Sequence, residues 1–399
     1  MKSLLKIPFY LSLAVIAVGG FSSCDGDDPV VENPESAQDI ALRPIIKQYV
    51  EDAVIDTYRS LSDATMDLFE ALEALKEDRA QDNVNAAAEA YLESRKFWER
   101  SEAWLNGAAS DFDIDPHIDS WPLDEEELAN TLANDGLMAR LEEEGGAYVN
   151  ESLGNLRRGF HGIEYILFEN GGVKDVSKIS EAETIYSWAV GEDLLWQVLR
   201  LEAGWAGLTA EDGYGVSAEK REIIEENELL VLATANTYYH GKNLLEAGNP
   251  GSSRRTVTDA AVFIFDGCTK ISDEVADTKI GNAHRGDKVD YIESPYSHNS
   301  FNDYIDNIRS IENAYRGGVE GKRDESKSLS SYVKTLDAAT DAAVIAAINK
   351  SIAKIEEAKA IGPFVEIYNH DICQEAMDEI TALSDALRAA KKLIEDNNI

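Results

Sequence analysis

Hydrophobic residues recur three and four positions apart along almost the whole chain after residue 44, and no segment alternates convincingly in the manner of a strand. This pattern predicts an all-α protein. The expected helices are separated by breaks, several of them rich in glycine and proline, and they cover about residues 44–75, 83–106, 125–144, 153–168, 180–208, 217–247, 256–281, 300–316, 328–360 and 364–396.

The succession of helices predicts two parts of similar size. A turn-rich break over residues 209–215 is the expected boundary. We therefore expect one helical bundle over residues 36–210 and a second over residues 211–399. The second half contains one long irregular stretch, residues 281–300, and long loops within helical bundles are often functional.

The most informative stretch has the sequence Gly-Phe-His-Gly-Ile-Glu over residues 159–164. His161 and Glu164 are three positions apart, so a helix would place both side chains on one face. An imidazole and a carboxylate so placed can bind one metal ion. Gly159 and Gly162 each cost about 1 kcal/mol in a helix interior relative to alanine, which predicts that a helix, a backbone or a ligand approaches closely. Such a His–Glu pair also occurs often by chance, so spacing alone does not establish a metal site.

A second pair of acids, Glu99 and Glu102, is also three positions apart, within the helix expected over residues 83–106. Two interpretations stay open for this pair. The carboxylates could converge with His161 on a cation, or they could form ion pairs with Arg95 and Arg100 of the same helix.

The composition is strongly acidic, with 75 Asp and Glu against 37 Lys and Arg and a net charge of −38. Nucleic acid is therefore not an expected partner, because phosphate binding needs a basic surface. An acidic surface suits cations, basic partners or simple solubility.

The first 24 residues resemble a bacterial lipoprotein signal peptide. Lys2 and Lys6 precede an apolar stretch, and small residues come immediately before Cys24. We expect Cys24 to be lipidated and residues 25–35, rich in Asp and Pro, to form an acidic tether; an ordinary secretory signal is the alternative. The expected location is the outer membrane of the bacterial cell envelope, surface-exposed or periplasmic, with membrane contact only through the lipid. Nothing in the sequence decides whether Cys268 and Cys373 are bridged.

Three ordered blocks of sequence resemble the imelysin family, and together they span nearly the whole chain after the signal. These blocks are Arg95-Lys-Phe-Trp-Glu-Arg-Ser-Glu102 with Asp115-Pro-His-Ile-Asp-Ser-Trp-Pro-Leu-Asp124, then Gly159-x-His161-x-x-Glu164, and finally Glu293-Ser-Pro-Tyr-Ser297 before a helix that ends Asn313-Ala-Tyr-Arg-Gly317. The ordered set is far more specific than any one motif.

The resemblance implies an all-α protein of two four-helix-bundle-like halves packed side by side, with a site between them, in a cell-envelope protein linked to iron uptake. The expected ligand is a metal ion, iron or an iron chelate, with zinc as the alternative, and other iron-uptake envelope proteins are expected partners. The expected metal ligands are His161, Glu164, Glu99 and Glu102. The residues expected to line the site are Arg95, Trp98, Asp119, Tyr296 and Ser297.

The family has also been labelled a metallopeptidase, which gives a second hypothesis. A hydrolytic zinc needs three protein ligands, an open position and a general base. The chain has no His-Glu-x-x-His, and Tyr165 stands where the inverted motif needs its second histidine. A third ligand would have to come from Glu99, Glu102, Asp119, His284 or His298. In a third hypothesis the protein is a recognition module without metal, and His161 donates hydrogen bonds in the core.

Overall fold

The computed structural model describes residues 35–397. The expected signal peptide, its Cys24 and almost all of the expected tether lie outside the described residues. The prediction of an all-α protein is confirmed, because the regular structure of the described chain is helical apart from one small antiparallel pair of strands, β1 (Phe168–Glu169) and β2 (Gly172–Val173). Within this part of the chain, no helix combines the length and the apolar content that crossing a bilayer requires.

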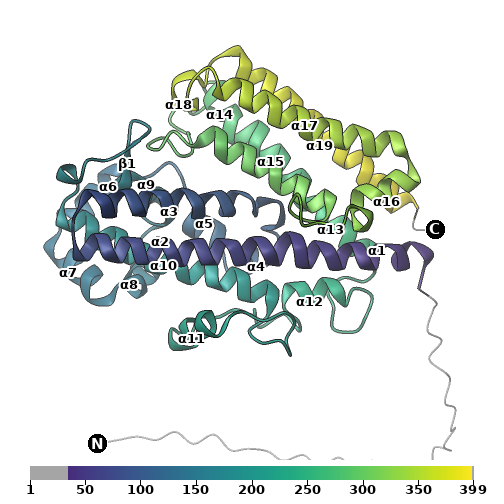
Figure 1. Cartoon of the computed structure of the whole chain (residues 1–399), viewed down its shortest axis with the longest axis horizontal. Coiled ribbons are helices and arrows are strands. Elements are labelled where there is room, and N and C mark those ends of the chain that lie inside the picture. Colours follow the sequence, from purple (N-terminus) through teal and green to yellow (C-terminus); the bar gives the residue numbers. More distant parts are fainter. Residues whose placement is uncertain (1–34, 398–399) are drawn as a thin grey trace, which may run out of the picture. The chain divides into compact units, whose positions relative to one another are not determined.

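Four helices from the first half of the chain pack in a closed ring, in which α2 contacts α3, α3 contacts α9, α9 contacts α10 and α10 contacts α2. Figure 1 shows α2, α3 and α10 running alongside one another. Their bounds are α2 (Asp56–Glu77), α3 (Gln81–Glu99), α9 (Gly159–Leu167) and α10 (Glu181–Ala206). Helix α1 (Ala37–Gln48) leads into α2 through a π-helical turn, η1 (Tyr49–Ile55).

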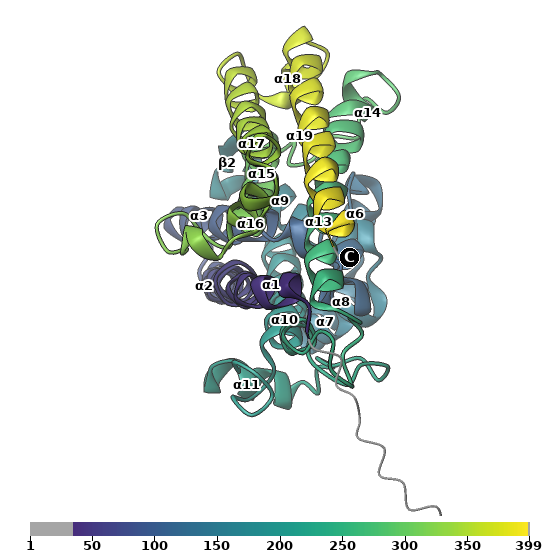
Figure 2. The same ribbon diagram turned by 90° about the vertical axis from the view of Figure 1, so that its right-hand side faces the viewer.

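A second ring of four helices comes from the other half of the chain. In it α13 contacts α15, α15 contacts α17, α17 contacts α19 and α19 contacts α13, an arrangement that Figure 2 shows from the side. The bounds are α13 (Val257–Glu274), α15 (Ser300–Arg316), α17 (Ala338–Lys359) and α19 (Asp371–Asp396). The fold therefore contains two four-helix arrangements.

The two rings share one hydrophobic core. Helix α15 packs on α3, α1 packs on α13, and the 3₁₀ turn η2 (Glu102–Trp104) packs on both α13 and α15. A continuous cluster of buried apolar side chains includes Leu61 of α2, Phe265 of α13 and Ile380 of α19. Helices α11 (Ala218–Glu226) and α12 (His240–Leu245) follow the expected boundary and pack on α10; the boundary itself stays a prediction.

Several of the expected helices are shorter than predicted or are interrupted. The stretch expected over residues 125–144 is divided by Asn134, whose side chain accepts hydrogen bonds from the Gly136 and Leu137 amides and so starts a new helix. The remaining elements are α4 (Ala108–Asp111), α5 (Ile114–Ile118), α6 (Glu125–Leu132), α7 (Asp135–Glu144), α8 (Gly146–Ser152), η3 (Asn155–Arg157), η4 (Val176–Lys178), η5 (Val275–Ile280), α14 (Gly281–His284), η6 (Glu325–Lys327), α16 (Leu329–Leu336) and α18 (Phe364–Ile367).

Candidate metal centre

Helix α9, which carries the His–Glu pair, begins at Gly159 and not at residue 153 as expected. Gly159 has a φ of +71°, and a Cβ atom there would lie 2.0 Å from the carbonyl oxygen of Ile118. Only glycine combines this backbone conformation with so close an approach. At Gly162 a Cβ would lie 2.2 Å from the hydroxyl oxygen of Tyr186. The expected close approaches are therefore confirmed, by a backbone at one glycine and by a side chain of α10 at the other.

The approach at Gly159 brings His161 next to Asp119, the residue that follows α5. The His161 side chain is buried, and its Nε2 lies 3.0 Å from Asp119 Oδ1 while its Nδ1 lies 3.4 Å from Glu164 Oε2. Burial alone would lower the pKa of His161, but the adjacent Asp119 and Glu164 outweigh it and raise the pKa to about 9. Without a metal the ring is therefore an imidazolium at neutral pH.

Glu164 connects α9 to the long irregular loop before α15. Its Oε1 accepts hydrogen bonds from the Tyr296 amide at 3.1 Å, the Ser297 amide at 2.9 Å and the Ser297 hydroxyl at 2.7 Å. Tyr296 and Ser297 thus lie beside the His–Glu pair. The Ser297 side chain does not cap α15, whose N-terminal flanking residue is Asn299.

Asp119 is held from the α3 side by two expected residues. The Trp98 indole Nε1 donates a hydrogen bond to Asp119 Oδ2 at 2.7 Å, and the Arg95 guanidinium forms an ion pair with Oδ1. Burial by itself would raise the pKa of Asp119, but the Arg95 charge and the contact with His161 hold it well below its usual range. Asp119 is therefore a permanent carboxylate next to His161.

Arg95 is fully buried and contacts several acids at once. It forms ion pairs with Glu99, one turn further along α3, and with Glu293 Oε1 at 2.6 Å. Arg100 pairs instead with Asp306 of α15 at 2.7 Å. Of the two ion pairs considered for this helix, the structure therefore contains the one between Arg95 and Glu99.

Lys279 is the second buried cation of the cluster, and it comes from the π-helical turn η5. Its Nζ lies 3.0 Å from Glu293 Oε1, 3.3 Å from Glu102 Oε1 and 3.4 Å from Glu99 Oε2. Helix α3 ends at Glu99 and Glu102 begins η2, so the expectation of one continuous helix was wrong. The two carboxylates nevertheless converge, because both contact the same ammonium group.

The buried cluster contains more acids than cations. Six buried carboxyl groups surround the two permanent cations Arg95 and Lys279, and they belong to Glu99, Glu102, Asp119, Glu164, Glu293 and Asp303. Burial raises the pKa of Glu99 to about 8 and that of Asp303 to about 7, in spite of the opposing charge of Arg95. We call this set of side chains, with His161, the acid-rich centre. Its excess negative charge has to be neutralised by bound protons or by a cation.

Four polar atoms of the acid-rich centre are buried without a hydrogen-bond partner: Glu293 Oε2, Glu99 Oε1, Arg95 Nε and His161 Nε2. The last three lie in ion pairs, with Arg95, Asp303 and Asp119 respectively, which leaves Glu293 Oε2 as the carboxylate oxygen without either kind of contact. Single ligand atoms of Asp119, His161 and Glu293 lie within 4.8 Å of one another, and the same is true of Glu99, Glu102 and Asp119. Ligands about 2.1 Å from one ion are roughly 3–4 Å apart, so a small contraction of the first group would enclose a metal.

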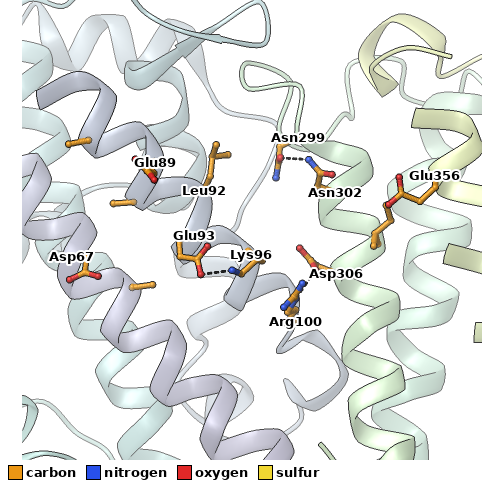
Figure 3. Close-up of a pocket in the computed structure, with 14 residues that line it drawn as sticks. Asp67, Glu89, Leu92, Glu93, Lys96, Arg100, Asn299, Asn302, Asp306 and Glu356 are labelled. Atoms are coloured by element: carbon orange, nitrogen blue, oxygen red, sulfur yellow. Dashed lines mark hydrogen bonds and ion pairs between the residues drawn. The ribbon is translucent and has the colours of Figure 1, made fainter. Parts of the chain in front are cut away.

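The structure has a pocket that borders the centre and a larger one that none of the centre's side chains lines. One, of about 520 Å³, has His161 in its wall, together with residues of the loop before α15 and of α18. The other, of about 800 Å³, lies between α3 and α15 (Figure 3). Its two basic side chains are already paired, Lys96 with Glu93 and Arg100 with Asp306, and none of the expected metal ligands lines it.

The other histidines and the cysteines have separate surroundings. His284 Nδ1 lies 2.9 Å from the carbonyl oxygen of Tyr368, and His298 packs against Gly171. Neither belongs to the two groups of ligand atoms found in the described chain. Cys268 and Cys373 are both buried and free, so they are not bridged.

Sequence reasoning did not assign Lys279, Glu293, Asp303 or Asn307 to the site. Glu293 opens the third of the sequence blocks described above, and this position was a usable signal. Asp303 and Asn307 are four apart on a buried face of α15, where Asn307 donates a hydrogen bond to Glu99 Oε2 at 2.5 Å. Lys279 is itself buried, in a segment whose apolar residues Val275, Ala276 and Ile280 are also buried, and a buried lysine needs a partner.

The fold and the buried centre define an all-α protein in which two four-helix arrangements both contribute side chains to one acid-rich cluster. The chain belongs to the Imelysin family, whose sequence model matches residues 54–394 and also carries a peptidase label. It is 25% identical, over 309 residues, to Iron-regulated protein A of Synechococcus elongatus, a match that covers 77% of this chain and 73% of that protein.

Solved structures show the same fold. A crystal structure from Parabacteroides distasonis, provisionally described as an iron-regulated protein A precursor, matches with a TM-score of 0.71 and 25% identity, covering 91% of this chain and 97% of that one. An imelysin-like protein from Psychrobacter arcticum matches with a TM-score of 0.55 and 13% identity, covering 88% and 94%; this second likeness concerns the fold alone.

Proposed function

We propose that this protein binds iron at the acid-rich centre and acts as a component of iron uptake in the bacterial cell envelope. The relatives named above are described as iron-regulated, which supports a role connected with iron. One of them is described as a precursor, which supports export, as does the N-terminal sequence. Lipidation at Cys24 and location in the outer membrane are part of the same proposal.

The proposal depends above all on Glu293 Oε2, a buried carboxylate oxygen without a hydrogen-bond partner, in the group of ligand atoms that Glu293 forms with His161 and Asp119. A buried acceptor without a donor costs about 1–3 kcal/mol, and a cation between this oxygen, His161 Nε2 and Asp119 would remove that cost. One imidazole and two carboxylates form a mixed nitrogen and oxygen set that suits iron and other borderline ions.

In this arrangement Glu164 positions the histidine. Because its Oε2 is next to His161 Nδ1 while its Oε1 is fixed by the Tyr296 and Ser297 amides, it would hold the ring with Nε2 toward Asp119. Carboxylates that hold the far nitrogen of a histidine ligand are a common feature of metal sites. Glu99 and Glu102 contact the Lys279 ammonium and would add negative charge near the metal. They would be available as ligands if that ammonium moved.

Metal titration of the purified protein tests the proposal. We expect wild type to bind one equivalent of Fe²⁺ under anaerobic conditions, and Zn²⁺ more tightly or similarly. His161→Ala and Glu293→Gln should each weaken binding by more than about 100-fold, since even outer partners of ligands contribute about 10–100-fold. His240→Ala is the matched control, because His240 pairs with Asp111 outside the centre. Equal and negligible heats for wild type and His161→Ala would contradict the proposal.

The role in the cell needs its own tests. Deleting the gene in the source bacterium should reduce the accumulation of radioactive iron under iron limitation, and His161→Ala should not restore it. Metabolic labelling with a palmitate analogue should mark wild type and not Cys24→Ser. An unlabelled wild type would contradict the anchor and leave the metal site unaffected.

A zinc peptidase is the second candidate, because a pocket reaches His161 and could admit a peptide. The geometry favours it less, since Glu164 is buried and its Oε1 already accepts three hydrogen bonds, which leaves it poorly placed as a general base. Zinc-dependent peptide cleavage that disappears in Glu164→Gln would favour the peptidase; tight metal binding without turnover would favour the binding protein.

A further inference from the structure

The pocket next to His161 is much larger than a metal ion requires. Its volume is about 520 Å³, whereas one water molecule takes up about 30 Å³ and pockets for small organic molecules measure about 300–1,000 Å³. An ion with its bound waters would leave most of this space filled with solvent. The pocket therefore fits an organic molecule that accompanies the metal.

Aromatic side chains form much of the wall of this pocket. Trp121, Tyr296 and Tyr368 all line it, and all three are only partly buried. Tyr291 packs against Trp121 from outside the lining, with ring centroids 3.8 Å apart, so the indole is supported on one side. Supported aromatic rings with an open face provide rigid contact area for a flat ligand.

The charges of the pocket restrict the ligand further. His161 is the one basic residue of its lining and would lose its proton on binding a metal, and the other two charged residues are both acids, Glu125 and Asp290. Glu125 accepts a hydrogen bond from the Tyr296 hydroxyl at 2.6 Å. A polyanionic ligand would find no lysine or arginine among the lining side chains, and no cationic partner at all once His161 has bound the metal, whereas a cation would be attracted both by the carboxylates and by the aromatic faces.

We propose, building on the iron-binding function above, that the cargo is iron held by a small, flat organic chelator in a complex that is cationic overall. The chelator lies in the pocket against Trp121 and Tyr368 and keeps its own donor atoms on the iron. His161 Nε2 replaces one water on the metal: the iron–water bond breaks, the iron–nitrogen bond forms, and the imidazolium proton passes to solvent. The oxidation state of the iron does not change.

Binding of a defined chelate tests this inference. The probe is the bis-maltolato complex of iron(III), which carries one positive charge and leaves two coordination positions open. Trp121→Ala and Tyr368→Ala should each weaken its binding by at least about tenfold, while the affinity for Zn²⁺ alone stays within about twofold. Tyr238→Ala, a tyrosine outside the pocket, should leave both affinities unchanged. Pocket variants that bind the chelate as wild type does, or a wild type that does not bind it, would overturn the inference.

A pair of charge changes at the pocket provides a second measurement. Val289 is 52% exposed, so Val289→Asp and Val289→Arg should both fold normally. The aspartate should strengthen binding of the cationic chelate and the arginine should weaken it. Equal effects would overturn the charge preference, as would binding of the trianionic tris-catecholate complex of iron(III) as tight as that of the cation.

The two proposals fail in different ways. If Zn²⁺ binding does not depend on His161, the metal centre itself is contradicted. If Zn²⁺ binding depends on His161 but the chelate is insensitive to every pocket variant, only the chelate inference is overturned.

Discussion

Two of the groups of charged side chains that join helices in the described part of the chain differ in charge balance. The first is the acid-rich centre, with six carboxyl groups around Arg95 and Lys279. The second joins α2, α10 and α11: Lys220 Nζ lies 2.8 Å from Glu202 Oε2 and 2.5 Å from Asp63, while Arg59 lies 3.7 Å from Glu202. Two acids there face two bases.

The difference shows what each group can do. In the α2–α10–α11 group every acid has a base, and the Lys220 ammonium also donates to the Ser62 hydroxyl at 2.7 Å, so no charge is left for another ion. The acid-rich centre has acids in excess. Each group has a buried carboxylate oxygen without a hydrogen-bond donor, Glu293 Oε2 in the centre and Glu202 Oε1 in the other, so the charge balance is what distinguishes the two. A balanced buried pair is sufficient to join helices, whereas the unbalanced set provides capacity for a cation.

The largest expected effect is the loss of a buried cation from the centre. Arg95→Met should lower the free energy of unfolding by about 3–5 kcal/mol, because it leaves Asp119 and Glu293 buried without their guanidinium. Lys220→Met should cost less, since Arg59 remains near Glu202 and Asp63 is mostly exposed. Urea denaturation measures both free energies of unfolding. A greater loss for Lys220→Met than for Arg95→Met would contradict the expected difference between the two groups.

The next effect concerns metal affinity and not stability. Glu164→Gln keeps an acceptor oxygen for the Tyr296 and Ser297 amides but removes the charge next to His161 Nδ1. We expect Zn²⁺ affinity to fall by about 10–100-fold. Glu202→Gln, at a similarly buried glutamate of the balanced group, should leave affinity unchanged. Calorimetry measures the Zn²⁺ affinity of both variants. Equal losses of affinity would contradict the expected difference between the two groups.

The two groups should also differ in their dependence on pH. Glu99 and His161 have pKa values raised to about 8 and about 9, so between about pH 5 and 9 the folded state binds more protons than the unfolded chain. Stability without metal should therefore fall as the pH rises through this range. Asp119 has a lowered pKa, so its contribution to stability is constant over this range and is lost only in acid. Because a metal competes with these protons, saturating Zn²⁺ should reverse the slope.

Thermal unfolding at several pH values, with and without Zn²⁺, measures this difference. In His161→Gln the melting temperature should fall less steeply above pH 6.5, because the imidazole whose pKa is raised to about 9 is gone. A melting temperature of the metal-free wild type that rises steadily from pH 6 to 9 would contradict the prediction.

The smallest effect is expected at the edge of the balanced group. The side chain of Asp63 is 63% exposed although it contacts Lys220, and exposed ion pairs contribute about 0–1 kcal/mol. Asp63→Asn should change stability by no more than this. A loss above about 2 kcal/mol would show that the second group also depends on a full set of charges.

Much of the fold followed from periodicity, and the local details did not. The long helices α10 and α15 were predicted within a few residues because their apolar spacing is regular, and α19 was predicted with the correct end but begins seven residues later than expected. The break between Glu99 and Glu102 was not predicted, since it depends on how η2 packs against α13 and α15. The start of α9 at Gly159 likewise depends on the distant Ile118 carbonyl, which no local pattern reveals.

The centre was partly visible in the sequence. Spacing and family resemblance singled out His161, Glu164 and Asp119, and the structure brings these three together. Their roles as metal ligands or positioning groups stay predictions. Lys279 could not have been placed from periodicity, because a π-helical turn changes the direction of its side chain relative to an α-helix.

This π-helical turn has a consequence for how the family can vary. A π-helical turn arises when one residue is inserted into an α-helix, and each residue turns an α-helix by about 100°. Removing one residue from 275–280 would therefore rotate the Lys279 ammonium away from Glu99, Glu102 and Glu293. A homologue shortened in this way would keep all three acids and lose their internal counter-ion, so that a single deletion could change how many ions the protein carries.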